Sequence, residues 1–268
     1  MSEKKVLFEV KDSIATITIN LPKMSNPLDN DICCEITAAV QNCATDENIR
    51  VVVITGAGKN FCAGGDISMF KTFVDKGEGL PPSLVESAGK MAMAIRTCPK
   101  PVIAMINGAA AGAGAGLAMA CDYRIVEPKS RIITAFIGLG VSTDTHLMYN
   151  LAKYVGSARA LEMIMCNTPI DGATALQWGL ANRCAEEGTL ADVTYAFAAT
   201  LAKGPTYTYG KQKELMNKYL YGDLPEYSED EVYMLSHCSE TPDFSEAVYA
   251  FLEKRPATFT GKAPAKKN

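Results

Sequence analysis

The chain has 268 residues, of which 48% are hydrophobic and 21% charged, and its formal net charge is −4. This length favours one large domain, or one domain with a small appendage; the mild negative charge argues against nucleic-acid binding, and no apolar run reaches the roughly 18 residues of a membrane span. Nine scattered cysteines, two histidines and a charged N-terminus with no apolar segment behind it predict a cytoplasmic protein with reduced thiols, no signal peptide and no metal site.

The N-terminal elements begin with two short strands, at residues 5–10 and 14–20, around a turn at 11–13. Prolines and an asparagine mark residues 21–27 as a loop. Asp29 then stands where a helix N-cap is expected, before a helix to about Thr45 with apolar residues on one face.

Residues 51–55 and 102–106 are continuous apolar runs, which is typical of strands buried on both faces. A helix is expected between them, at roughly 82–97. A buried strand, a helix and a second buried strand predict a right-handed parallel crossover. Residues 123–126 and the pair 132–133 are candidates for further strands.

Beyond residue 144 the pattern is mostly helical. Helices are expected near residues 144–153, 157–164, 171–178, 189–203, 205–220, 229–238 and 243–253. The sequence therefore predicts an α/β core followed by a helical part, which we divide into a core at 1–200, a C-terminal helical region at 201–262 and a disordered tail at 263–268.

Two glycine-rich segments follow the buried strands. Residues 61–66, Phe-Cys-Ala-Gly-Gly-Asp, could bring backbone N–H groups close to a ligand, although an ordinary glycine turn is the plainer interpretation. Residues 108–117 lead into an apolar helix whose N-terminus could hold an oxyanion, or whose small residues could simply allow close packing. The second run lacks the spacing of nucleotide-binding fingerprints.

Asp144 lies between an apolar stretch and an expected helix start. Taken alone, it is most simply interpreted as a helix N-cap. Cys62 is the only cysteine that the sequence places beside a candidate site, and the other cysteines are expected to be small packing residues.

Taken together, these segments resemble the crotonase (enoyl-CoA hydratase/isomerase) superfamily over about residues 5–262. The matching motifs occur in family order, and they are Ile54-Thr55-Gly56, Phe61 to Asp66, Lys100 to Ala104, Asn107-Gly108, Cys121-Asp122, Leu151 to Gly156, Ala173 to Leu180 and Phe251 to Arg255.

The resemblance implies a spiral of ββα units with a C-terminal helical region that forms trimers or hexamers. It also implies an acyl-CoA substrate, with CoA as part of that substrate and no separate cofactor. The N–H groups of Gly65 and Ala113 would hold the thioester oxygen as it becomes an enolate. Residues expected to bind the substrate or its CoA are Lys23, Met24, Ala63, Gly64, Asp66, Ile67, Gly112 and Phe136, with Phe251 and Lys254 from a neighbouring subunit.

The sequence also departs from the family pattern. The two glutamates with which hydratases activate water correspond to Gly116 and Phe136, which cannot move a proton. Asp144, by contrast, matches an aspartate of several non-hydratase branches. The chain is most similar to the ring-epoxide phenylacetyl-CoA isomerases and, in part, to the 4-chlorobenzoyl-CoA dehalogenases.

The resulting hypothesis is an acyl-CoA isomerase in which Asp144 takes a proton from carbon 2 and returns it at a conjugated carbon. One alternative is an enoyl-CoA or dienoyl-CoA hydratase with relocated acids, for which Glu86 is a candidate. The others are a ring-opening hydrolase, a ring-forming synthase, a dehalogenase and a non-catalytic acyl-CoA-binding protein.

Overall fold

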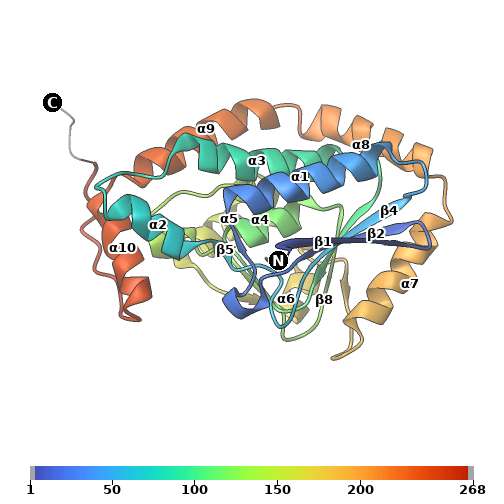
Figure 1. The fold of residues 1–268 in the computed structure, drawn as a ribbon, viewed down its shortest axis with the longest axis horizontal. Coiled ribbons are helices and arrows are strands. Elements are labelled where there is room, and N and C mark those ends of the chain that lie inside the picture. Colours follow the sequence, from blue (N-terminus) through green and yellow to red (C-terminus); the bar gives the residue numbers. More distant parts are fainter. Residues whose placement is uncertain (1–3, 265–268) are drawn as a thin grey trace.

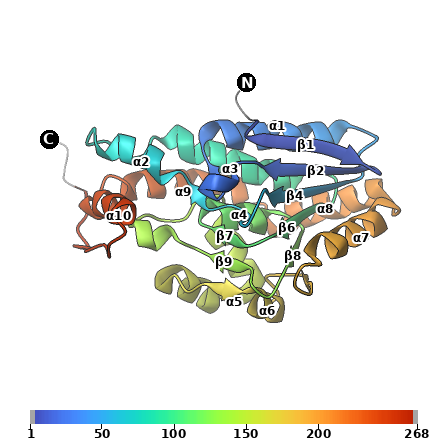
Figure 2. The ribbon, with the colours of Figure 1, turned by 60° about the horizontal axis from the view of Figure 1, so that its bottom comes forward.

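A computed structural model describes residues 4–264, and their fold is built on a six-stranded sheet with helices on both faces (Figure 1). In the order in which they lie side by side, its strands are β1 (Val6–Lys11), β2 (Ile14–Ile19), β4 (Val51–Gly56), β6 (Val102–Ile106), β8 (Tyr123–Val126) and β11 (Arg183–Cys184). The hairpin β1–β2 is antiparallel, and every later pair in this sheet is parallel; Figure 2 shows β1, β2 and β4 side by side. The predicted strands and the parallel crossover between β4 and β6 are confirmed.

Two smaller sheets lie near the carboxyl ends of the central strands. One pairs β3 (Pro27–Leu28) with β5 (Gly64–Gly65). The other runs β10 (Ile170–Asp171), β9 (Arg131–Ile133) and β7 (Ala109–Ala111). An isolated bridge joins Cys62 to Ala110, so the two glycine-rich segments lie side by side.

The helices cover the sheet in layers, with α1, α3, α8 and α9 above it and α7 below it in Figure 1. Their bounds are α1 Asn30–Thr45, α2 Ile67–Val74, α3 Pro82–Thr97, α4 Ala113–Ala120, α5 Leu147–Cys166, α6 Gly172–Gln177, α7 Leu190–Ala202, α8 Thr206–Leu220, α9 Leu224–Cys238 and α10 Pro242–Leu252. Two short 3-10 helices, η1 (Pro22–Met24) and η2 (Phe136–Leu139), complete the list.

The continuous apolar strands serve two cores, because successive side chains of a strand point to opposite faces. In β4, Val52 and Ile54 pack in the large core beneath α1 and α3, whereas Val51 and Val53 pack against α7. β6 divides its residues in the same way. The sheet is therefore fixed from both sides, which gives the loops at its carboxyl edge a rigid base.

The structure refines the expected helices at several points. Asp29 caps α1 by accepting the N–H of Ile32 at 2.8 Å, as predicted. The helices expected at 144–153 and 157–164 form one element, α5, interrupted at Gly156, which has a φ of 78°. α2 was not expected, and α9 begins at Leu224 rather than near residue 229.

The predicted boundary at residue 200 falls inside α7, two residues before its end. α7 packs on the central strands, whereas α8 and α9 pack on α3. The division into a core and a helical region remains a prediction. Most of the tail predicted at 263–268 lies outside the described residues, and in residues 4–264 no helix is long and apolar enough to cross a membrane.

Candidate active site

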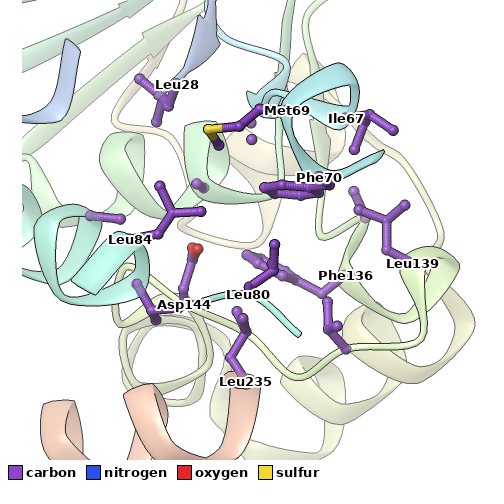
Figure 3. Close-up of a pocket in the computed structure, with 18 of the residues that line it drawn as sticks. Leu28, Ile67, Met69, Phe70, Leu80, Leu84, Phe136, Leu139, Asp144 and Leu235 are labelled. Carbon is purple, nitrogen blue, oxygen red and sulfur yellow. The ribbon is translucent and has the colours of Figure 1, made fainter. Parts of the chain in front are cut away.

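A pocket opens where the two glycine-rich segments meet α1, α2, α3, η2 and α9 (Figure 3). Several elements far apart in the sequence build it. Its walls consist of Leu28, Asp29, Cys33, Ala63, Gly64, Gly65, Ile67, Met69, Phe70, Leu80, Leu84, Val85, Ala88, Gly112, Ala113, Ala135, Phe136, Leu139, Val141, Asp144 and Leu235. The predicted residues Ala63, Gly64, Gly65, Ile67, Gly112, Ala113, Phe136 and Asp144 are all among them.

One wall of the pocket is made of backbone. Gly64 has a φ of 88° and Gly112 a φ of 52°, conformations that residues with a Cβ rarely adopt. A Cβ on Gly64 would lie 2.7 Å from the carbonyl oxygen of Ala111 and 3.4 Å from the nitrogen of Ala113, so only glycine allows this approach. Ala113 is the first residue of α4, and N–H groups in a first helical turn have no acceptor within their helix.

Asp66 lies at the end of this wall, directly before helix α2. Its carboxylate accepts the N–H groups of Ser68 at 2.8 Å and Met69 at 3.3 Å, which caps α2. Asp66 is not one of the lining residues, although its neighbours Gly65 and Ile67 are. A role in binding substrate remains a prediction.

Asp144 provides the acidic group of the opposite wall. Figure 3 shows its carboxyl group pointing into the pocket among Leu80, Leu84 and Phe136. Burial raises the pKa of Asp144 from 3.8 to about 7, and a hydrogen bond from the Thr145 hydroxyl, at 3.1 Å, opposes this rise. An aspartate with a pKa near neutrality can both take and return a proton.

The interpretation of Asp144 as a helix N-cap is wrong. The N-cap of α5 is His146, which has a φ of 57° and gives no side-chain cap. Thr145 precedes it with a φ of 54°, so two residues in the left-handed region separate Asp144 from the helix. These two residues turn the chain so that the side chain of Asp144 faces the pocket instead of the helix N-terminus.

Thr145 also occupies the space beside Gly116, which the family resemblance matches to a glutamate of the hydratases. A Cβ on Gly116 would collide with the hydroxyl and Cβ of Thr145. The Thr145 hydroxyl donates to the backbone oxygen of Asp144 at 2.7 Å as well as to its carboxylate. Thr145, which hydrogen-bonds to Asp144, therefore fills the space that a side chain at position 116 would need.

The rest of the pocket is apolar. Phe136 begins η2 directly after Ala135, which has a φ of 62°. A Cβ on Gly112 would lie 3.9 Å from the Phe136 ring, so this ring packs directly beside the backbone wall. Phe70 of α2 and Leu235 of α9 contribute from other sides. An apolar lining of this kind suits a hydrocarbon group and reduces access of water.

The second carboxylate of the pocket, Asp29, is already engaged. It caps α1 and forms an ion pair with Lys5 at 2.7 Å. Glu86, the relocated acid considered above, lies on the exposed side of α3, pairs with Lys90 at 3.1 Å and does not line this pocket. That candidate for a second acid is therefore wrong.

A carboxylate that the sequence did not suggest lies just behind Asp144. Glu231 of α9 is 6% exposed and accepts the backbone N–H of His146 at 2.8 Å. The hydroxyls of Thr143 and Tyr227 also donate to it, each at 3.2 Å. Burial first, and the charge of Asp144 second, raise the pKa of Glu231 to about 8.

The cysteines need one correction. Besides Cys62, Cys33 of α1 is also close to the site, and Cys33 lines the pocket itself. Burial raises the pKa of both thiols, that of Cys62 to about 12, so both remain protonated at neutral pH. Among residues 4–264, no group of His, Cys, Asp or Glu has the arrangement of a metal site.

Besides Asp66, four predicted binding residues lie outside the pocket. Lys23 and Met24 form the exposed turn η1, and Met24 is 52% exposed. Phe251, 62% exposed, lies near the end of α10, and Lys254 follows that helix with a φ of 57°. The last two were expected to reach the site of a neighbouring subunit, so their roles stay predictions.

Comparison with known proteins places these features in context. A family model described as enoyl-CoA hydratase/isomerase matches residues 9–262. The trans-2-decenoyl-[acyl-carrier-protein] isomerase of Streptococcus mutans is 32% identical, over 98% of this chain and 100% of the relative. The 1,2-epoxyphenylacetyl-CoA isomerase of Escherichia coli is 31% identical, over 96% of this chain and 98% of the relative.

A solved structure shows the same fold. The enoyl-CoA hydratase of Mycobacterium avium subsp. paratuberculosis superposes with a TM-score of 0.86 at 28% identity, covering 93% of this chain and all of the other. The expected spiral α/β architecture is thereby confirmed.

Proposed function

Because the chain belongs to the enoyl-CoA hydratase/isomerase family of enzymes, with the crotonase fold, we propose that it is an isomerase that moves the double bond of an acyl thioester. Asp144 removes a proton from carbon 2 of a 3-enoyl group. The electrons shift toward the thioester oxygen, giving a dienolate, and Asp144 returns the proton at carbon 4. The product is the conjugated 2-enoyl thioester, and no atom is gained or lost.

The observation that carries this proposal is a single available carboxyl group in an otherwise apolar pocket that Gly65 and Ala113 also line. The N–H groups of Gly65 and Ala113 would form the oxyanion hole for the dienolate. Asp144, whose pKa of about 7 suits proton transfer in both directions, serves as base and then as acid. The catalytic residues of the proposal are thus Asp144, Gly65 and Ala113.

Hydration is disfavoured by the same geometry. Adding water in the manner of the two-glutamate hydratases needs a second acid–base group aimed into the pocket. Thr145 occupies the space at Gly116, Phe136 occupies the other glutamate position, and Asp29 is engaged with Lys5. Exclusion of water by Phe136 and its apolar neighbours favours return of the proton over attack by water.

The acyl group is carried as a thioester, and two carriers are candidates. The Streptococcus mutans relative is named for an acyl-carrier-protein substrate and the Escherichia coli relative for a CoA substrate. We propose CoA as the carrier, bound by Ala63, Gly64, Ile67 and the turn Lys23–Met24. Because CoA and acyl carrier proteins share the same thioester chemistry in the pocket, an assay must compare them directly.

A ring isomerisation is the second candidate. The name of the Escherichia coli relative motivates it, and the aromatic rings of Phe70 and Phe136 in the pocket favour a flat acyl group. The same Asp144 and the same oxyanion hole would serve that reaction.

We further propose that the enzyme is a cytoplasmic homotrimer or a hexamer made of two trimers. Tyr207, Leu215 and Met216 of α8 are 80%, 55% and 52% exposed in one chain, a large apolar area for a surface helix. All nine cysteines are free thiols, which suits a reducing compartment. Light scattering coupled to size-exclusion chromatography tests the assembly, and a monomer at micromolar concentration would contradict it.

The test of the function uses 3-decenoyl-CoA and the same acyl group on an acyl carrier protein, with conjugation followed by ultraviolet absorption and product mass by mass spectrometry. We expect conjugation without a change of mass. Asp144→Asn should lower kcat by about 10²- to 10⁴-fold, whereas Asp230→Asn on the exposed side of α9 should not. A product that has gained one water would indicate a hydratase, and full activity of Asp144→Asn would refute the mechanism.

A further inference from the structure

The segment that carries Asp144 is held on its outer side by one face of α9. Tyr227, Ser228 and Glu231 lie within about one turn of this helix, and all three face residues 143–146. The Tyr227 ring lies edge-on to the ring of His146, with the two centroids 6.5 Å apart. Ser228 Oγ lies 3.0 Å from Nε2 of His146. These contacts join residues more than 80 positions apart in the chain.

We propose that Glu231 is a positioning residue, whose carboxyl group fixes the segment Thr143–His146 on both sides of Asp144 and so aims Asp144 at the pocket. This inference rests on the function proposed above, because it assigns the support of the proton-transferring group. Glu231 is not a catalytic residue, since it does not line the pocket.

The two side-chain oxygens of Glu231 each bond to a different residue of the segment. Oε2 accepts the N–H of His146, two residues after Asp144, and Oε1 accepts the hydroxyl of Thr143, one residue before it. Tyr227 donates to Oε1 from the preceding turn of α9, which orients the carboxylate itself. The buried side chain of Glu231 thus bonds to the segment on both sides of Asp144.

The segment needs such support because its backbone is strained. Thr145 and His146 are consecutive non-glycine residues with positive φ, a conformation that persists only where the surroundings impose it. Without an acceptor, the N–H of His146 would be a buried unpaired donor. Releasing it would let His146 return to a helical conformation and turn Asp144 away from the pocket.

The charged and titratable groups around the pair are few. Cys33 of α1 and Cys62 lie near Asp144, and burial keeps both thiols protonated. Burial and the positive charge of Arg96 on α3 lower the pKa of His146 to about 4, so this ring is neutral. The charge of Asp144 raises the pKa of Glu231, which places the two carboxyl groups within electrostatic reach of each other.

The experiment compares Glu231→Gln with Glu231→Leu. The amide oxygen of Gln can still accept the N–H of His146, whereas Leu fills the volume without any acceptor and leaves that N–H unpaired. Circular dichroism checks that both variants are folded under the assay conditions. We expect Glu231→Gln to retain kcat within about threefold and Glu231→Leu to lose about 10- to 100-fold in kcat with little change in KM. The exposed neighbour variant Asp230→Asn is the matched control. Wild-type kcat in Glu231→Leu would overturn the proposal.

A second measurement separates this proposal from the proposed function, because it does not use turnover. The raised pKa of Asp144 makes the folded protein lose stability as pH rises from about 4 to about 7, and Asp144→Asn should remove that loss. We expect the effect of Asp144→Asn on the pH dependence of unfolding to persist beside Glu231→Gln and to vanish beside Glu231→Leu, where Asp144 turns toward water. Its persistence beside Glu231→Leu would refute positioning by Glu231, whatever reaction the enzyme catalyses.

Discussion

The two walls of the pocket are built on different principles. The wall of Gly64, Gly65, Gly112 and Ala113 is backbone, held by strand pairing and by a helix N-terminus. The wall of Asp144 is a side chain on a strained segment, held by a distant helix. The first wall contains no titratable group and has no room for a Cβ at Gly64 or Gly65. The second wall depends on the pKa of Asp144, which burial sets, and on the contacts that hold its segment in place. An enzyme made this way can keep its backbone wall fixed while its acid–base group changes.

The largest effect should come from removing one donor of the backbone wall. Ala113→Pro deletes the N–H at the first position of α4, where proline is compatible with a helix. We expect a loss of about 10²- to 10³-fold in kcat, or about 3–4 kcal/mol, with helix content and the unfolding midpoint unchanged by circular dichroism. Ala113→Gly, which keeps the N–H, is the control and should stay active. Equal activity of both variants would mean that this N–H holds no oxyanion.

A smaller effect should follow from adding a side-chain atom to α4 where it meets Thr145, in the wall that carries Asp144 (the acidic wall). In Gly116→Ala the new Cβ overlaps Thr145, and such overpacking costs typically about 1–3 kcal/mol of unfolding free energy. Urea unfolding measures this loss, and Gly138→Ala, whose Cβ would meet nothing closer than 3.4 Å, is the matched control. Adding Thr145→Gly should restore the stability of Gly116→Ala. Failure of that rescue would show that the two residues do not compete for space.

The smallest effect is a pH dependence that only the acidic wall can produce. Because Asp144 must be ionised to take the first proton, and its pKa is about 7, kcat/KM should fall about fivefold between pH 7 and pH 6 and level off above pH 8. A buffer series at constant ionic strength measures the profile. A flat profile from pH 5 to pH 8 would show that Asp144 is ionised throughout and that its burial does not set its pKa.

The sheet could be predicted from the sequence because its signal is local. Residues 51–55 and 102–106 are apolar at every position, and that pattern is typical of a strand with a core on each face. The backbone wall was also predicted, since its glycines are confined to two short motifs and a glycine with positive φ needs no distant partner. α2 was missed because it is short and because Asp66, its N-cap, ends a motif that was interpreted as a loop.

The acidic wall could not be predicted in the same way. Asp144 was found only through resemblance to the family, and its local pattern pointed to an N-cap, because sequence alone does not show that Thr145 and His146 adopt positive φ. Glu231 lies among acidic residues of α9, such as Glu229 and Asp230, that read as a solvated face. What distinguishes Glu231 is contact with a segment far away in the chain, and no short pattern records such a contact.

The distance between Glu231 and the segment that it holds also has a consequence for synthesis. His146 is added to the growing chain 85 residues before Glu231, and at roughly 5–20 residues per second that interval is about 4–17 s. During this time the sheet and the glycine-rich wall can form, but the apolar pocket lacks Leu235 and the support of its acidic wall. The nascent chain should therefore bind chaperones at this stage and acquire catalytic competence only when α9 docks.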